Sequence, residues 1–182
     1  MLKEPRPGRV KTRLGRGIGM TGAAWWFRHQ VRLLLRNVQD PRWDIILAVT
    51  PDIDGMTSRI WPSQLRRIAQ GRGDLGDRMR RIFRTLPPGP ICIIGADIPD
   101  IRKPHIADAF NALGKHEAVF GPATDGGYWL IGLKRVRAVS PHLFRRVRWS
   151  SVHALSDSEA TLSGHSVTKI MSLRDVDTVA DL

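Results

Sequence analysis

Three polar segments of this 182-residue chain carry side chains suited to holding a divalent metal ion. They are Gly95–Asp100 (GADIPD), Gly121–Gly127 (GPATDGG) and Asp175–Thr178 (DVDT). Each follows an apolar run typical of a strand, and open α/β sheets bind ligands at the carboxyl ends of their strands. Carboxylates gathered at one edge are costly without a cation, and one or two carboxylates plus substrate phosphates suit Mg²⁺. The pattern therefore predicts a Mg²⁺ site, or a Mn²⁺ site, at this edge.

A basic loop near the N-terminus offers positive charge for a phosphorylated ligand. Residues 5–14 read PRPGRVKTRL, in which Gly8 allows close approach of the backbone to a ligand. Arg9, Lys11 and Arg13 supply charged donors, and arginine can bind phosphate through two hydrogen bonds. The loop is not a Walker A motif, because GxxxxGK[ST] is absent. An exposed basic arm is the alternative interpretation of the same charges.

The acidic residues also have purely structural interpretations. Asp97 and Asp100 could cap the helix that follows them, and Asp175 or Asp177 could cap a terminal helix. Asp125-Gly126 could be an ordinary hairpin turn. Their joint position at strand ends favours ligand binding. No competing catalytic pattern is present, since the histidines lack zinc-ligand spacing and no G-x-S-x-G motif occurs.

Strands and helices alternate around these segments. Short apolar runs predict strands at 44–50, 65–69, 90–96, 118–121, 128–133 and 166–171. Apolar residues at helical spacing predict helices at 22–38, at 74–86, from Pro104 onward and at about 151–163. Asp74 is placed to cap the second helix with Asp77 at its third position. The first twenty residues, rich in Gly, Pro and Arg, are expected to form a loop.

This alternation predicts an α/β fold in one domain, residues 1–182, with a mostly parallel sheet centred on Pro90–Ala96. The chain carries 29 Lys and Arg against 17 Asp and Glu, which suggests anionic partners. A phosphorylated small molecule is favoured over nucleic acid, because no nucleic-acid-binding motif accompanies the charge. The single cysteine, Cys92, excludes a disulfide framework. Without a long apolar run or a signal peptide, we expect a cytoplasmic protein.

Several spaced motifs make the chain recognisable. They are PGRVKTRL at 7–14, QGRGDLGDRM at 70–79, GADIPDI at 95–101, GPATDGGYWLIGL at 121–133, Trp149-Ser150 and DVDTVADL at 175–182. Across nearly its whole length the chain resembles a bacterial glycosyltransferase-A-like family, the arsenosugar biosynthesis glycosyltransferases or selenodomain-associated transferases. The resemblance implies a three-layer α/β/α nucleotide-diphospho-sugar transferase fold. The first strand would be largely missing, because the chain begins at Met1-Leu2-Lys3, and a terminal helix would normally continue beyond Leu182.

The resemblance also implies roles for residues. The loop containing Gly8, Arg9, Lys11 and Arg13 would hold nucleotide phosphates, and Gly73 with Asp74 would lie near the base or ribose. Asp97 would be the primary metal ligand, with Asp177 as the second. Asp97 and Asp125 would be the catalytic carboxylates. The acceptor side would be lined by Asp125, Gly126, Gly127 and Trp149.

These features predict a metal-dependent transferase that acts on a nucleotide-activated substrate, in the first place a nucleotide-sugar glycosyltransferase. A nucleotidyltransferase that releases pyrophosphate is the close alternative, because both use the same metal and phosphate contacts. A non-catalytic nucleic-acid-binding or scaffold protein is the second alternative, suggested by the net charge of +12. The base, the sugar, the acceptor and the oligomeric state stay open.

Overall fold

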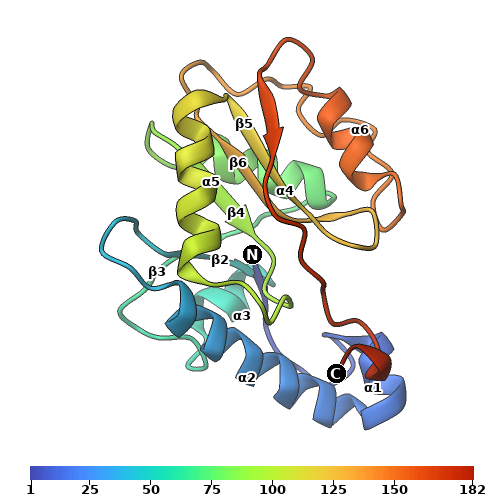
Figure 1. Cartoon of the computed structure of the whole chain (residues 1–182). Helices are drawn as coiled ribbons and strands as arrows, with labels where there is room; N and C mark the ends of the chain where they lie inside the picture. The colour runs from blue at the N-terminus through green and yellow to red at the C-terminus, as the bar shows by residue number, and fades with distance from the viewer. The chain divides into compact units, whose positions relative to one another are not determined.

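In the computed structural model, which describes residues 1–182, the chain divides into two units (Figure 1). The first unit comprises Met1–Gln70, Gly95–Lys103 and Asp175–Leu182. The second comprises Gly71–Ile94 and Pro104–Arg174. The first unit contains the basic N-terminal loop and two of the three acidic segments. The second contains the Gly121–Gly127 segment.

A three-stranded parallel sheet supports the first unit. Its strands are β1 (Leu2–Lys3), β2 (Ile46–Thr50) and β3 (Arg66–Ala69), in the order β1-β2-β3. β1 has only two residues, in agreement with the expected short first strand. The buried amide of Gln70 holds it in place, because its Nε2 donates to the carbonyl oxygens of Leu2 (3.0 Å) and Ala48 (2.8 Å).

Three helices and a 3-10 turn complete the first unit: α1 (Thr12–Ile18), α2 (Met20–Val38), α3 (Asp52–Thr57) and η1 (Val179–Asp181). The predicted helix at 22–38 is confirmed as α2. The prediction of a loop over the first twenty residues is wrong, because α1 lies there. α1 is too short and too rich in glycine to show an apolar period. Tertiary packing stabilises it: the Leu14 side chain is fully buried, and a Cβ on Gly15 would meet Ala23 of α2 at 3.5 Å.

A four-stranded sheet supports the second unit, in the order β4 (Ile91–Ile94), β6 (Tyr128–Leu133), β5 (Ala118–Pro122), β7 (Val167–Lys169). β6 runs antiparallel to both of its neighbours, whereas β5 and β7 are parallel. In the first sheet all three strands are parallel, and in the second sheet β4, β5 and β7 share one direction and only β6 runs the other way. This confirms the mostly parallel α/β fold. The prediction that Pro90–Ala96 is central is wrong for this sheet, since β4 lies at its edge. An apolar sequence does not fix the place of a strand in its sheet: β6, which pairs with both β4 and β5, takes the inner position.

The helices of the second unit are α4 (Leu75–Thr85), α6 (Ala154–Ala160) and all of α5 (Lys103–Lys115) except its first residue. In Figure 1, α5 lies in front of the four-stranded sheet and α4 behind it. The predicted cap of α4 is confirmed, because Asp74 and Asp77 form a reciprocal capping box. None of the helices in the chain combines the length and apolar character that crossing a lipid bilayer requires.

Candidate functional site

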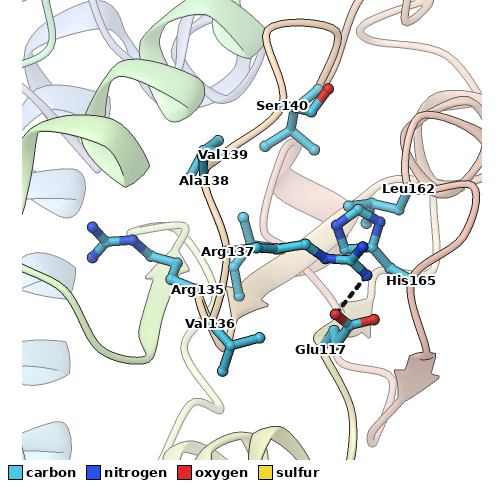
Figure 2. Close-up of a pocket in the computed structure, with 11 residues that line it drawn as sticks. Glu117, Arg135, Val136, Arg137, Ala138, Val139, Ser140, Leu162 and His165 are labelled. Atoms are coloured by element: carbon cyan, nitrogen blue, oxygen red, sulfur yellow. Dashed lines mark hydrogen bonds and ion pairs between the residues drawn. The ribbon is translucent and has the colours of Figure 1, made fainter.

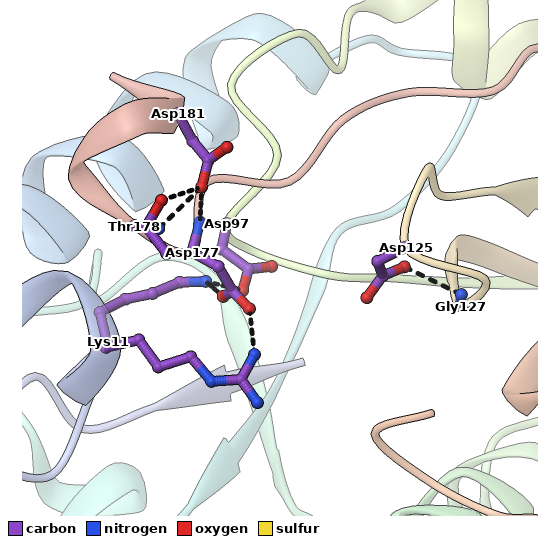
Figure 3. A network of polar contacts seen from close by, with 8 residues as sticks. Lys11, Asp97, Asp125, Gly127, Asp177, Thr178 and Asp181 are labelled. Atoms are coloured by element: carbon purple, nitrogen blue, oxygen red, sulfur yellow. Dashed lines mark hydrogen bonds and ion pairs between the residues drawn. The ribbon is translucent and has the colours of Figure 1, made fainter. Parts of the chain in front are cut away.

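Four of the predicted site residues meet in the first unit as a cluster of ion pairs, and Figure 3 labels Lys11, Asp97 and Asp177 among them. The Nζ atom of Lys11 lies 2.6 Å from Oδ2 of Asp97 and 2.8 Å from Oδ1 of Asp177. Nη1 of Arg13 lies 2.9 Å from Oδ2 of the same Asp177 carboxylate. We call Lys11, Arg13, Asp97 and Asp177 the Lys11 cluster. It joins both predicted metal ligands to two of the predicted phosphate-binding residues.

Backbone contacts hold the two carboxylates of the Lys11 cluster side by side. The amide of Val176 donates to the carbonyl oxygen of Asp97 at 3.2 Å, so the two acidic segments run together. Oδ2 of Asp181 then accepts from the amides of Asp177 (3.1 Å) and Thr178 (2.7 Å). Asp181 therefore positions Asp177, a role that the sequence reasoning missed. The signal was available, since Thr178 and Asp181 have the T-x-x-D spacing of a capping box.

The backbone of Lys11 adopts a conformation that is unusual for a residue with a side chain. Its φ of 45° and ψ of 49° are left-handed, and it occupies the N-cap position of α1. Such a conformation costs about 1–3 kcal/mol and persists only where surrounding contacts demand it. The two ion pairs of its ammonium are contacts of this kind. The Lys11 side chain is 8% exposed, against 32% for Asp97 and 35% for Asp177.

The ion pairs of the Lys11 cluster favour the charged forms of Lys11 and Asp177. Burial opposes the charge of Lys11, but the carboxylates of Asp97 and Asp177 outweigh it, so the pKa of the ammonium is raised. Burial likewise opposes the charge of Asp177, yet Lys11 and Arg13 outweigh it and lower the pKa of that carboxyl. The ammonium of Lys11 and the carboxylate of Asp177 are therefore both charged at neutral pH.

The helix-capping interpretation of these aspartates is wrong. α5 begins at Lys103, six residues after Asp97, too far for Asp97 to be its N-cap. η1 is capped by Thr178, with Asp181 as the reciprocal partner, and not by Asp177. Both carboxylates instead point to the ammonium of Lys11.

The other two predicted phosphate-binding residues, Gly8 and Arg9, are exposed. Gly8 and Arg9 lie in a turn in which the amide of Arg9 donates to the carbonyl oxygen of Arg6 at 2.9 Å. Gly8 has a φ of 72°, a left-handed value that favours glycine, although a Cβ there would meet no atom within 4 Å. The turn directly precedes the Lys11 cluster in the chain.

Asp125, Gly126 and Gly127 form the turn of the β5–β6 hairpin in the second unit. Oδ1 of Asp125 accepts from the amide of Gly127 at 2.9 Å, which confirms the hairpin interpretation of this residue. Gly126 has a φ of 88°, and a Cβ on it would lie 2.5 Å from Cα of Val152. The turn therefore packs closely on the segment before α6, while the Asp125 carboxylate is exposed.

The start of α4 and Trp149, predicted for different sides of the substrate, lie together in the second unit. A Cβ on Gly76 would meet Cζ2 of the Trp149 ring at 2.9 Å. The Trp149 ring also lies 6.5 Å from the Tyr128 ring. Its Nε1 is buried without a hydrogen-bond partner. Gly73 and Asp74 directly precede this contact, and Asp74 has a structural role as the α4 cap.

A family model described as "Uncharacterized protein conserved in bacteria (DUF2064)" matches residues 33–151. The chain belongs to the DUF2064 family. The match covers Asp97, Asp125 and Trp149, whereas Lys11, Arg13 and Asp177 lie outside it. No curated protein has a significantly matching sequence.

The fold of this DUF2064 chain is similar to those of several solved structures. A protein from Desulfovibrio desulfuricans G20, provisionally named a nucleotide-diphospho-sugar transferase, is 30% identical with a TM-score of 0.85. The match covers 99% of this chain and 81% of that one. The 4-diphosphocytidyl-2C-methyl-D-erythritol synthase of Anaerococcus prevotii DSM 20548 has a TM-score of 0.61 at 13% identity, over 84% and 82% of the two chains. This second likeness shows the fold alone. The predicted fold class is confirmed, and the first relative's name agrees with the predicted transferase class.

The Lys11 cluster of the DUF2064 chain offers two carboxylates to a divalent metal ion. The other coordination positions of the ion would have to be filled by water or by oxygens of a bound substrate. No group of three or more His, Cys, Asp or Glu side chains converges anywhere in the structure. Two carboxylates do converge, and the point between them already suits a cation, since an ammonium lies there. Mg²⁺ commonly takes one or two carboxylates and fills its other positions with water and phosphate oxygens. Asp97 and Asp177 fit that arrangement.

A hollow in the second unit is lined by none of the predicted site residues (Figure 2). Apolar side chains that include Leu133, Leu143 and Leu162 line it. The ion pair between Arg137 and Glu117, 2.6 Å long, closes one side. Glu117 directly precedes β5 and Leu133 ends β6, so the hollow lies at the opposite end of these strands from the Asp125 turn. We assign no ligand to it.

Proposed function

We propose that this DUF2064 protein is a metal-dependent transferase whose substrate is a nucleotide-diphospho-sugar. The observation that carries the proposal is the Lys11 cluster, in which two carboxylates and two cationic side chains share one site. A phosphorylated substrate with its metal needs both kinds of group. The name of the 30%-identical relative supports the same substrate class.

The chemistry assigns separate tasks to the residues of the Lys11 cluster. Asp97 and Asp177 would hold Mg²⁺ or Mn²⁺, which supplies charge neutralisation on the departing diphosphate. Arg13, whose side chain is 66% exposed, would donate to phosphate oxygens and orient the diphosphate. Lys11 and the exposed Arg9 side chain would add charged donors, and Gly8 would allow close approach of the ligand to the backbone.

The residues that the sequence resemblance assigns to the acceptor and to the nucleoside belong to the second unit. Asp125 is exposed at the hairpin turn, where its carboxylate can take a proton from an acceptor hydroxyl. Gly126, Gly127 and Trp149 would line the acceptor side, and Gly73 with Asp74 the nucleoside side. The sequence resemblance to arsenosugar biosynthesis glycosyltransferases favours sugar transfer over other group transfers.

Nucleotidyl transfer is the second candidate function. It is favoured by the fold shared with the diphosphocytidyl-methylerythritol synthase of Anaerococcus prevotii. The Lys11 cluster would serve it equally, because a metal and cationic donors stabilise departing pyrophosphate as they do a departing nucleoside diphosphate. The two functions differ in product rather than in site.

A ligand screen followed by product analysis tests the proposal. Ligands that bind the native state raise Tm, so nucleoside triphosphates, diphosphates and nucleotide sugars are tested with and without Mg²⁺. We expect a nucleotide sugar to raise Tm only with Mg²⁺, and turnover to release a free nucleoside diphosphate. Pyrophosphate as the product would establish nucleotidyl transfer instead. No shift with any nucleotide, together with strongly salt-dependent binding of DNA or RNA, would favour the non-catalytic alternative.

A further inference from the structure

The ammonium of Lys11 lies in the position that a metal ion would need. It contacts one oxygen of Asp97 and one of Asp177, at 2.6 and 2.8 Å. The other oxygen of Asp177 accepts from Arg13 at 2.9 Å. Three of the four carboxylate oxygens of the pair are therefore already bound to cationic side chains. A divalent ion cannot bind both carboxylates at these oxygens unless Lys11 moves away.

The charges of the Lys11 cluster make that displacement unfavourable for a metal alone. Two positive side chains balance two negative ones, so the four groups sum to zero. A divalent ion added by itself would leave an excess of two positive charges, and Lys11, whose side chain is 8% exposed, would lose its counter-ions in a largely buried place. A diphosphate ester brings two negative charges, which restore the balance and give the displaced ammonium a new partner.

We propose that Lys11 is the resident counter-ion of the Asp97–Asp177 pair, so that the site takes a divalent metal only together with a diphosphate-bearing ligand. Metal binding transfers the Lys11 ammonium from the carboxylates to the phosphates. The long, flexible stem of lysine suits this movement. By linkage, each ligand must then strengthen the binding of the other by the same factor. The inference rests on the proposed function, because it assumes that phosphate and metal share this site.

A static structural ion pair makes a different prediction. If Lys11 only tied the two acidic segments together, its removal would loosen both carboxylates and weaken metal binding. If it is the counter-ion, its removal frees two carboxylates and strengthens metal binding. The sign of one change separates the two roles.

Lys11→Met tests the sign, because methionine keeps an unbranched apolar stem and removes only the ammonium. Mn²⁺ alone is titrated into the wild type and the variant, and free Mn²⁺ is measured by electron paramagnetic resonance. We expect Lys11→Met to bind Mn²⁺ about ten-fold more tightly, within the usual range of coupling between sites. The Mn²⁺ that inorganic pyrophosphate binds in solution is measured without protein and subtracted. Beyond that amount, pyrophosphate should raise the Mn²⁺ affinity of the wild type about ten-fold, and that of Lys11→Met about two-fold or less.

Lys115→Met is the matched control, since Lys115 is exposed at the end of α5 and the net charge changes equally. It should bind Mn²⁺ as the wild type does. Where circular dichroism shows that Lys11→Met has not folded, Lys11→Gln takes its place. Equal or weaker Mn²⁺ binding by the folded variant overturns the counter-ion role. This outcome does not depend on which substrate the enzyme uses. Failure of every nucleotide sugar to react overturns the proposed function and leaves the Mn²⁺ comparison intact.

Discussion

Replacing Asp97 by asparagine separates the metal-binding role of this residue from its structural role. The change keeps the shape of the side chain and removes its charge. The 2.6 Å ion pair with Lys11 then becomes a hydrogen bond from the ammonium to the amide oxygen, in which only the donor is charged. Hydrogen bonds that involve a charged group contribute about 1.5–3 kcal/mol, and the variant keeps part of this interaction while it loses the attraction between two full charges. Because the Asp97 side chain is 32% exposed, solvent screening places the difference near the low end.

We therefore expect Asp97→Asn to lower the free energy of unfolding by about 1 kcal/mol, which lowers Tm by about 2–4 °C. The effect on ligand binding should be much larger. A ligand at one hundred times its Kd stabilises the native state by about 2.7 kcal/mol. The variant should lose all of the part of this stabilisation that depends on Mg²⁺.

The assay is a thermal and urea unfolding series with nucleotide ligand, with and without Mg²⁺. Asp100→Asn is the control, since Asp100 is exposed in the same loop and the charge change is identical. It should keep the wild-type response to Mg²⁺. A Mg²⁺-dependent shift of wild-type size in Asp97→Asn would refute the metal-ligand role.

Three further predictions concern stability. Gln70→Leu should lower the free energy of unfolding by about 2–4 kcal/mol in urea, because it leaves the two carbonyl oxygens that the amide pairs with unsatisfied; a loss well below this would show that β1 is held by other contacts. Gly121→Ala should cost about 1–3 kcal/mol, because its Cβ would lie 2.3 Å from Cε2 of the buried Trp129 ring, whereas Gly114→Ala, at an open helical site, should be neutral or slightly stabilising. The lowered pKa of Asp177 means that its carboxylate stabilises the fold above its usual pKa and loses this effect as pH falls through the lowered value. Asp177→Asn should accordingly lose less stability than the wild type between about pH 5 and pH 2, and parallel pH curves would contradict this.

Local features were predicted most closely. The capping box at the start of α4 could be read from Asp74 and Asp77 alone, because both partners lie within one helical turn. The strand at 128–133 and the helix at 22–38 were likewise visible in their apolar periods. α1 was missed, because its stability comes from packing against α2 and not from its own sequence. α3 was missed too, since the 51–73 segment has no clear period.

The candidate site was predicted in its residue types and only partly in its arrangement. Strand ends and acidic loops indicated that Asp97 and Asp177 would lie close together, and both carboxylates contact the ammonium of Lys11. The sequence did not indicate that Lys11 would lie between them, because 166 residues separate Lys11 from Asp177. It also assigned Lys11 to phosphate alone, whereas the structure pairs it with carboxylates.

By itself the sequence determined the alternation of strands and helices, the α/β class and the chemical groups available to the site. Those properties follow from local backbone preferences and from the period of apolar residues, which operate over a few turns or strand residues. Only the tertiary structure decided that β4 is an edge strand, that α1 is a helix, and that two carboxylates close on one ammonium. These features depend on contacts between segments that lie far apart in the sequence. The free energy of bringing such segments together depends on the packing of the whole unit, and no single stretch of sequence determines it.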